Sequence, residues 1–231
     1  MTSAAAEVAV DASGLYHIYR ERQVETVALR GAAVRLEAGR WTSVMGPSGS
    51  GKSTLVNVLA GFLEPSGGSV LVGGRDITQL SASERAARRR RDIGVVLQRD
   101  NLHPLLRVGE NVALALRLDS RPRREVLERT RELLDKLDLA DRAAQPAGTL
   151  SGGEAQRVAI AAALSPRPSV LLADEVTGEL DAENTASILD LLEEVRDRDG
   201  TAILTVTHNP LVAERADRRL TMRDGLLVDA G

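Results

Sequence analysis

Residues 46–54 read GPSGSGKST, and this stretch decides the fold. It matches the pattern G-x-x-x-x-G-K-[ST], in which a glycine-rich loop binds phosphate. Residues 42–46, TSVMG, are predicted to form a buried strand before it, and residues 55–63, LVNVLAGFL, have the apolar spacing of a helix after it. A strand, a glycine-rich loop and a helix in this order predict an α/β unit with a phosphate site at the loop.

The side chains and amides of this loop suit a nucleotide phosphate chain. Glycines let successive backbone N–H groups turn toward one point, where the start of the helix adds partial positive charge. Lys52 is expected to reach the terminal phosphates, and Ser53 offers a hydroxyl to Mg²⁺. A glycine-rich turn before an ordinary helix is the alternative. The predicted phosphate-binding residues are Gly46, Pro47, Ser48, Gly49, Ser50, Gly51, Lys52, Ser53 and Thr54.

A second motif ends an apolar strand with two carboxylates. Residues 169–175 read SVLLADE, which places Asp174 and Glu175 at the carboxyl end of a predicted strand, where open α/β sheets bind ligands. Asp174 is expected to hold Mg²⁺ directly or through water. Glu175 is placed to accept a proton from an attacking water, a role worth roughly 10² to 10⁴ in rate. A solvated acidic turn is the alternative.

A third motif, LSGGEAQR at residues 150–157, begins a predicted helix. Ser151 and Glu154 have the spacing of a capping box, which explains these two residues by itself. Capping does not explain Gly152 and Gly153, because glycine costs about 1 kcal/mol relative to alanine in a helix. Two glycines leave the first helical amides unobstructed, which indicates a second surface that faces phosphate.

The composition and the order of the segments bound the class of protein. The 231 residues carry 30 Lys and Arg against 33 Asp and Glu, and the formal charge of −3 does not favour nucleic acid as a partner. There are no cysteines, and no predicted signal peptide or membrane span, so cytosolic residence is expected.

Alternation of apolar residues around Val8, Leu15 and Val34 predicts several short strands before residue 40. Residues 107–140 are predicted to form an exposed helical insertion with its turn at 121–124, followed by alternating helices and strands.

These three motifs in this order resemble the ABC ATPase superfamily, and the resemblance covers nearly the whole chain. It implies an α/β fold with a P-loop NTPase (RecA-like) core, an N-terminal antiparallel β subregion and an inserted α-helical subdomain. One domain, 1–231, would contain an ATP-binding core of about 1–98 and 165–231 and a helical subdomain of about 99–164. It also implies that Ser151, Gly152 and Gly153 of one protomer close on the γ-phosphate that the other protomer's loop holds.

The resemblance assigns roles to further positions. Gln98 matches the Q-loop glutamine that senses Mg²⁺ and the attacking water, and His208 matches the switch histidine that contacts the γ-phosphate and supports the water at Glu175. Tyr19 matches the aromatic residue that stacks on adenine. A surface histidine and a core tyrosine are the alternatives. Residues 179–181 match the D-loop at the dimer contact, although Asp181 could equally cap a helix.

The run LLADEVTGELD at residues 171–181 is similar to the lipoprotein-release and macrolide-export branch, whose ATPases pair with separate permeases. Four residues depart from that branch near its catalytic positions. Val176 stands where proline is usual, Glu179 where asparagine is, Asn209 where aspartate is, and Ala162 where arginine is common. Losing the proline removes a fixed φ after Glu175. We expect hydrolysis nonetheless, because Lys52, Gln98, Asp174, Glu175 and His208 are all present.

The resemblance implies a transport ATPase with ATP and Mg²⁺ as cofactors. Its partners would be a transmembrane permease and a second ATPase subunit, as a homodimer or heterodimer, and it would lie at the inner face of the cell membrane through the permease. An ABC ATPase that relays closure to a membrane partner without transport is the alternative. A soluble ABC protein of DNA repair or translation would need coiled coils or tandem domains, which do not fit in 231 residues. A degenerate ATP-binding module is opposed by the complete catalytic set, although the four departures leave it open. Arg88–Arg91 are interpreted as a solvated helix face, with anion or lipid binding as the alternative, and Trp41 is interpreted as core packing.

Overall fold

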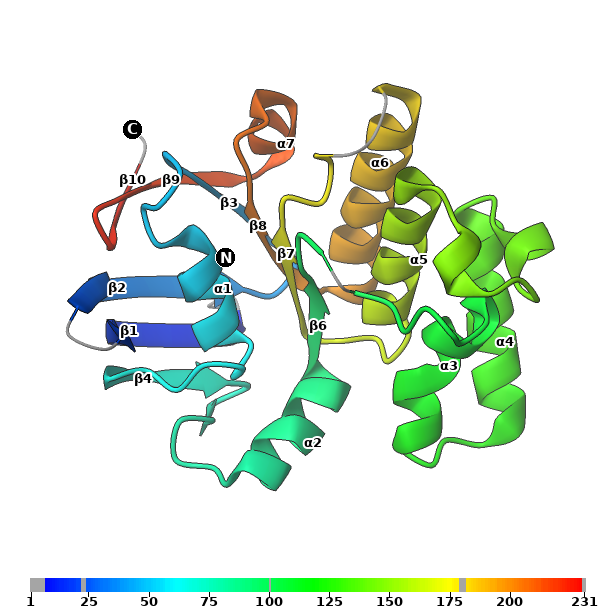
Figure 1. The fold of residues 1–231 in the computed structure, drawn as a ribbon, viewed down its shortest axis with the longest axis horizontal. Helices are drawn as coiled ribbons and strands as arrows, with labels where there is room; N and C mark the ends of the chain where they lie inside the picture. The colour runs from blue at the N-terminus through cyan, green and yellow to red at the C-terminus, as the bar shows by residue number, and fades with distance from the viewer. Residues whose placement is uncertain (1–6, 22–23, 100, 179–181, 230–231) are drawn as a thin grey trace, which may run out of the picture.

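The computed structural model describes residues 7–21, 24–99, 101–178 and 182–229 (Figure 1). Two sheets and a group of helices make up this part of the chain, and the predicted α/β fold with an antiparallel subregion and a helical insertion is confirmed. The antiparallel sheet has the order β2-β1-β4-β5, and the other sheet has the order β10-β9-β3-β8-β7-β6.

The antiparallel sheet begins with a long hairpin. Its strands are β1 (Val8–Glu21), β2 (Val24–Glu37), β4 (Gly67–Val72) and β5 (Arg75–Asp76). The prediction of several short strands before residue 40 is therefore wrong, because two strands of 14 residues each fill that region. The register of β1 against β2 shifts between Ala12 and Leu15 and again between His17 and Ile18. These irregularities interrupt the alternation of apolar residues, so one bent strand looks like several in the sequence.

The second sheet is mainly parallel and lies at the centre of the molecule (Figure 1). Its strands are β3 (Trp41–Met45), β6 (Ile93–Val96), β7 (Val170–Asp174), β8 (Ala202–Val206), β9 (Arg218–Arg223) and β10 (Leu226–Asp229). Every residue of β7 and β8 is buried, as expected for strands covered on both faces. Leu172 and Leu204 pack with β1, β2 and α1 (Lys52–Leu59), whereas their neighbours Leu171 and Ile203 pack with the helices on the other face.

The helical insertion packs against that second face. It contains α3 (Val108–Leu118), α4 (Arg123–Lys136), the short 3₁₀ helices Ala140–Arg142 and Ala147–Thr149, and α5 (Gly152–Leu164). The turn predicted at 121–124 is confirmed only in part, because residues 119–122 connect the two helices and α4 already begins at Arg123. Leu133 of α4 and Val158 of α5 share one core cluster with Ile188 of α6 (Ala182–Asp199). The predicted boundaries of the helical subdomain stay a prediction.

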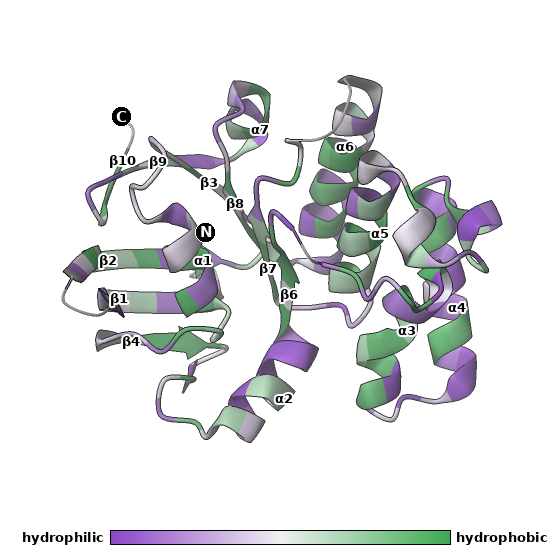
Figure 2. Ribbon diagram, in the orientation of Figure 1, coloured by the Kyte–Doolittle hydropathy of each residue, from purple (hydrophilic) through white to green (hydrophobic). Residues whose placement is uncertain are grey.

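Two smaller features complete the fold. Trp41 is fully buried, as predicted, and its indole Nε1 donates to Thr205 Oγ1 at 2.9 Å. The basic run lies on α2 (Ala82–Asp92), and the interpretation as a solvated helix face is wrong for Arg88 and Arg89. Arg88 donates to the carbonyl of Val72, and Arg89 donates to the carbonyl of Gly61 and lies over the Phe62 ring at 4.3 Å. The arginines fix α2 to the body of the protein. Figure 2 shows this hydrophilic end of α2 beside the hydrophobic central strands.

Candidate functional site

The glycine-rich loop joins β3 to α1 at the carboxyl end of the sheet. Gly51 is the N-cap of α1 with φ of 106°, no side chain caps the helix, and its first turn holds no acidic residue. A Cβ at Gly51 would lie 2.4 Å from the carbonyl oxygen of Ala28, so only glycine fits there without displacing β2. The start of α1 therefore presents free backbone amides and partial positive charge, which suits an anion.

Lys52 folds back over this loop. Its Nζ donates to the carbonyl of Gly46 at 2.8 Å and to the carbonyl of Pro47 at 2.9 Å. These contacts place the ammonium group beside the helix start, where it adds a full positive charge to that of the amides. The loop is held from outside as well, because the amide of Gly225 donates to the carbonyl of Ser50 at 3.0 Å.

Asp174 is the last residue of β7 and is almost completely buried. Burial raises the pKa of its carboxyl group, and the neighbouring Glu175 adds to the rise. A hydrogen bond from Ser53 and the charge of Lys52 oppose it, so the pKa remains raised overall despite two stabilising neighbours. The cavity disfavours an unpaired negative charge. The carboxylate oxygens of Asp174 and the hydroxyl oxygen of Ser53 lie together there and form a donor set that fits a hard divalent cation.

Glu175 begins the turn after β7 with φ of 56°, a left-handed conformation that is uncommon outside glycine. Its amide donates to the carbonyl of Val206 at 2.9 Å, and its carbonyl accepts from Gly178 at 3.2 Å. The carboxylate lies close to residues that follow β8. Oε2 accepts from Thr207 Oγ1 and from the amide of His208, both at 3.4 Å, and Oε1 lies 2.9 Å from His208 Nδ1. The strained turn thus points the carboxylate at the end of β8.

Two of the departures from the branch lie beside this turn. Val176 is buried, and Asn209 is the N-cap of α7 (Pro210–Arg215), where its side chain accepts from the amide of Leu211. Asn209 Nδ2 also donates to Thr177 Oγ1 at 3.3 Å, and its amide donates to Thr207 Oγ1 at 2.9 Å. An amide side chain can accept at the helix and donate to Thr177 at once. Asn209 therefore ties the turn after β7 to the turn after β8. Ala162 lies away from this region on α5, and Glu179 lies outside the described residues together with the rest of the predicted D-loop, 179–181.

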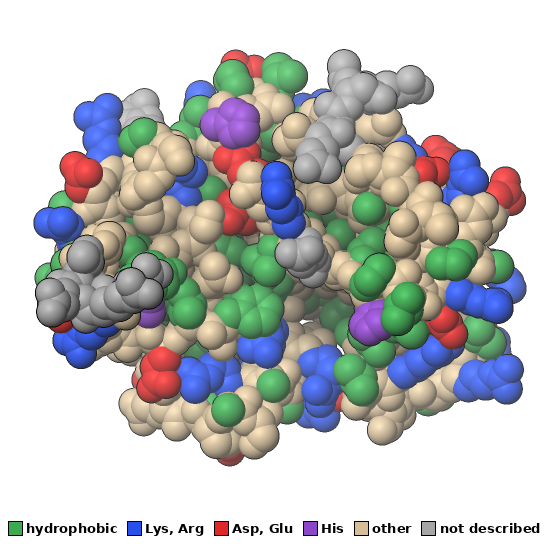
Figure 3. All heavy atoms as spheres, in the orientation of Figure 1, with side chains coloured by type: hydrophobic (Ala, Val, Ile, Leu, Met, Phe, Trp, Pro, Cys, Tyr) green, Lys and Arg blue, Asp and Glu red, His purple; other side chains and the backbone are tan. Residues whose placement is uncertain are grey.

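The structure brings most of the predicted site residues to one cleft of about 520 Å³. In Figure 3, acidic side chains and a histidine gather on this face above the ends of the central strands. The predicted residues that line the cleft are Tyr19, Gly46, Ser48, Gly49, Gly51, Lys52, Ser53, Thr54, Gln98, Asp174, Glu175 and His208. Pro47 and Ser50 do not line it and instead shape the loop, in which the amide of Ser50 donates to the carbonyl of Pro47. The exposed Gln98 follows β6 by two residues.

Tyr19 lies at the edge of the cleft and is neither a core residue nor a free surface residue. Its side chain remains 38% exposed. The hydroxyl lies 3.3 Å from Thr54 Oγ1, and the ring meets His17 edge to face with centroids 4.6 Å apart. The residue is thus partly exposed at the cleft, next to the phosphate loop. This geometry suits a planar base.

Ser151, Gly152 and Gly153 are absent from the described lining of the cleft and lie at the start of α5. The predicted capping box is present: Ser151 Oγ accepts from the amide of Glu154 at 3.3 Å, and the Glu154 carboxylate accepts from the amide of Ser151 at 2.9 Å. Arg142 lies 3.1 Å from Glu154. Ser151 and Gly152 are exposed, so this surface is presented outward and does not contribute to the cleft of its own chain.

Two parts of the site are not marked in the sequence. Thr207 binds the Glu175 carboxylate, and its position directly before His208 is the only signal that could have indicated it. Residues 26–28 of β2 also line the cleft, although they come from the hairpin and carry no recognisable motif. Both contributions depend on how the strands are arranged.

Comparisons with known proteins agree with this geometry. A family model described as "ABC transporter" matches residues 29–178. The chain is 42% identical over 203 residues to the lipoprotein-releasing system ATP-binding protein LolD 1 of Rhodopirellula baltica, covering 88% of this chain and 89% of that protein. The dimeric structure of MJ0796, a bacterial ABC transporter cassette, superposes with a TM-score of 0.90 at 34% identity over 96% of this chain and 99% of that one. A second dimeric structure of MJ0796, in a post-hydrolysis state bound to ADP and Pi, gives the same values.

Proposed function

The chain belongs to the ABC transporter family and is an ATPase of that family, and we propose that two copies close around two Mg·ATP and drive a separate transmembrane permease. The single observation that carries the proposal is the convergence of Lys52, Asp174, Glu175 and His208 on one cleft from three strand ends. Such a cleft can hold a triphosphate, its cation and an attacking water together.

ATP binding is assigned to the loop and to Tyr19. The amides at the start of α1 and the ammonium of Lys52 would hold the β- and γ-phosphates, and Tyr19 would stack on adenine at the mouth of the cleft. Mg²⁺ would be held by Ser53 and Asp174, together with Gln98, which lines the same cleft. The cation would neutralise charge that develops on the phosphates. The Ser53 hydroxyl and the buried Asp174 carboxylate support this assignment by their chemistry.

Glu175 is proposed as the general base. Its carboxylate is largely buried and receives three contacts from Thr207 and His208, which fix its direction toward the cleft. From there it would accept a proton from the attacking water. His208 is far more exposed, at 76% against 13% for Glu175, so the imidazole can turn toward a γ-phosphate while Thr207 keeps the carboxylate in place.

Dimer formation follows from the outward position of the LSGGE segment. The cleft holds residues that would contact one face of the nucleotide. Within the described part of the chain, we assign the exposed amides at the start of α5 as a second surface that binds its phosphates. A second copy would place its Ser151, Gly152 and Gly153 over the γ-phosphate. Both solved structures of MJ0796 are dimeric, which supports dimer formation. Whether the partner copy is identical or a homologue does not change the chemistry.

The permease contact is assigned to a groove of about 330 Å³ between α2, β6 and α3. Phe62, Leu114 and Leu118 line it and are exposed, and Ala162 lies in its wall. Exposed apolar side chains gathered in one groove mark a protein interface. None of the helices in the described ranges has the length and apolar character that crossing a bilayer requires. The groove supports a position of the chain at the inner face of a membrane, bound to a permease. The similarity to a lipoprotein-releasing ATPase favours transport over relay without transport.

The test is ATP turnover of the purified chain beside Glu175→Gln, with oligomer size measured with and without Mg·ATP. We expect the parent to hydrolyse ATP and Glu175→Gln to lose turnover and accumulate as an ATP-bound dimer. Glu214→Gln, on the exposed surface of α7, is the matched control and should behave as the parent. A Glu175→Gln variant that retains turnover, or that stays monomeric with Mg·ATP, would contradict the proposal.

The permease contact has a separate test in membranes of the source cell. Leu118→Asp should release the chain from sedimenting membranes, because a carboxylate in the groove cannot be buried without a partner. Leu211→Asp is the control, since Leu211 is equally exposed but lies on α7 outside the groove. Equal release by both variants would show that the groove is not the contact.

A further inference from the structure

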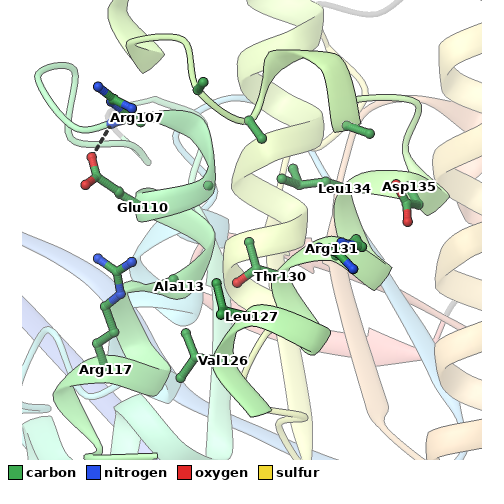
Figure 4. A pocket seen from close by; sticks show the side chains of 14 residues that line it. Arg107, Glu110, Ala113, Arg117, Val126, Leu127, Thr130, Arg131, Leu134 and Asp135 are labelled. Carbon is green, nitrogen blue, oxygen red and sulfur yellow. Dashed lines mark hydrogen bonds between the residues drawn. The ribbon is translucent and has the colours of Figure 1, made fainter. Parts of the chain in front are cut away.

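A second groove, separate from the nucleotide cleft and from the groove assigned to the permease, lies between α3 and α4 (Figure 4). It has a volume of about 480 Å³, and none of its lining residues lines either of the other two. One wall is α3, the other wall is α4, and the segment around Ala140 and Ala143 closes one end. The chemistry of ATP hydrolysis does not use this surface.

The floor of the groove is apolar. Ala113 of α3 and Val126 and Leu134 of α4 form it, and these three side chains are themselves buried. Leu127 stands at the side of the floor and is 53% exposed. Leu127 turns its apolar surface to water beside a groove that is also apolar. This arrangement is typical of a surface that another apolar surface covers.

The rim of the groove is basic and its charges are unpaired. Arg117 on α3 and Arg131 on α4 lie on opposite sides in Figure 4, and Arg107 lies at one end. Within the described part of the chain these three guanidinium groups form no ion pair. Glu110 accepts a hydrogen bond from the amide of Arg107, and Asp135 also lies on the rim, so the rim is basic by one charge overall.

Three other arginines of the same two-helix unit are paired. Arg121 pairs with Glu125, Arg124 with Glu128 and Arg129 with Glu132. Arg124 pairs although its side chain is 88% exposed, so exposure alone does not leave an arginine unpaired on this helix. Among the described arginines of this unit, those without a carboxylate partner are Arg107, Arg117 and Arg131, which flank the groove, and Arg123, which begins α4 outside it. We infer a partner that brings the missing carboxylates.

We propose that the groove between α3 and α4 binds an amphipathic helix of a partner protein, with apolar side chains on one face and acidic side chains along its flanks. Two antiparallel helices form a trough into which the ridge of a third helix packs. Leucines at helical spacing would cover Leu127 and the floor, and acidic residues on both flanks would reach Arg117 and Arg131. This inference does not depend on the permease.

An anionic membrane is a weaker occupant. The surface is concave, whereas a bilayer surface is flat and would leave the apolar floor uncovered. Glu110 and Asp135 also lie on the rim, and an anionic lipid surface would repel them. A protein helix can place its acidic side chains beside the arginines and avoid these carboxylates.

The test uses the full chain and two labelled helical peptides of about 16 residues, long enough to span α4. Both carry leucines at positions i, i+3, i+4 and i+7, and their flanks carry glutamates in one and lysines in the other. We expect the acidic peptide to bind and raise the fluorescence anisotropy, and the lysine peptide not to bind. The double variant Arg117→Glu and Arg131→Glu reverses two charges, and it should lower the affinity for the acidic peptide by about tenfold or more. The matched control Arg124→Glu, on the same helix but outside the groove, should change its affinity less than twofold.

The lysine peptide should bind the doubly reversed variant, which separates charge recognition from a loss of folding. Circular dichroism checks that the double variant folds. If it does not fold, the proposal is tested by comparing the binding of the two peptides to the parent chain. Three outcomes would overturn the proposal. The parent could bind both peptides equally, Leu118→Asp could lose peptide binding where the doubly reversed variant keeps it, or vesicles of phosphatidylglycerol could displace the peptide. ATP turnover of the parent is measured in the same samples. A parent that hydrolyses ATP and ignores the peptide overturns this inference alone, and one that binds the peptide without turnover overturns the proposed function alone.

Discussion

His208 Nδ1 lies 2.9 Å from Glu175 Oε1, although the two residues follow different strands, β8 and β7. The same carboxylate accepts from Thr207 Oγ1 and from the amide of His208. One residue pair therefore joins two strand ends at the cleft. The left-handed backbone of Glu175 is stabilised by these contacts and by its own hydrogen bond to Val206, and the strain is retained at the residue to which we assign the base.

This pair predicts the effect of removing the imidazole. His208→Ala should lower kcat for ATP by about 10²-fold, because a positioned donor that acts on developing charge is lost, while KM for ATP changes little. The loop residues that hold the phosphates are untouched. Steady-state kinetics measure both parameters. His208→Gln keeps a side-chain donor and should retain more activity than His208→Ala, and equal kcat in all three proteins would argue against a role for the imidazole.

The phosphate loop predicts different results for two glycines. Gly51→Ala places a Cβ 2.4 Å from the carbonyl of Ala28 at φ of 106°, so β2 and the helix start must move apart. Gly49→Ala carries the cost of a positive φ, about 1 kcal/mol, but its Cβ meets nothing within 4 Å. We expect Gly51→Ala to weaken ATP binding more than tenfold and Gly49→Ala to weaken it less, as measured by fluorescent-nucleotide titration. The reverse order would contradict the geometry of the loop.

The two capping boxes predict a separation of stability from dimer formation. Ser151 caps α5 and Ser81 caps α2 with the same pair of hydrogen bonds to Glu154 and Glu84. Ser151→Ala and Ser81→Ala should each lower the free energy of unfolding by about 1 kcal/mol in urea titrations. Only Ser151→Ala should also lose the ATP-dependent dimer in sedimentation experiments. A dimer that forms equally in both variants would show that Ser151 is only a cap.

The raised pKa of Asp174 predicts a pH effect on stability in Mg²⁺-free buffer. Burial, with Glu175, raises this pKa above 3.8, and Ser53 and Lys52 offset only part of the rise. A raised carboxyl pKa means that the folded state holds the proton more tightly than the unfolded state. The contribution of Asp174 to the free energy of unfolding is therefore full below pH 3.8, and it is lost as the pH rises through the raised pKa. Asp174→Asn removes this loss. The stability of the variant relative to the parent should therefore grow as the pH rises above 3.8 and level off past the raised pKa. Thermal unfolding measures this difference, and a constant difference would contradict the assignment.

The sequence predicted the parts of the site that are continuous in the chain. The loop at 46–54, the acidic end of β7 and the capping box at Ser151 are local motifs, because backbone amides, a strand end and a helix start need only a few neighbouring residues. It could not predict that β1 and β2 are two long strands with shifted register, since a bulge breaks the alternation from which strands are recognised. It also missed that Arg88 and Arg89 bind carbonyl groups of distant segments.

By itself, then, the sequence determined the α/β fold, the phosphate loop and the identity of the carboxylates, since each depends on residue types at short spacing. The tertiary structure alone decided which of these residues meet. It placed Thr207 and His208 on the Glu175 carboxylate, put β2 at the wall of the cleft, and turned the LSGGE amides away from it. It also left Arg117 and Arg131 unpaired across an apolar groove. The physical reason is that contacts between strand ends and helix faces depend on how the sheets and helices pack, and packing brings together residues that lie far apart in the chain.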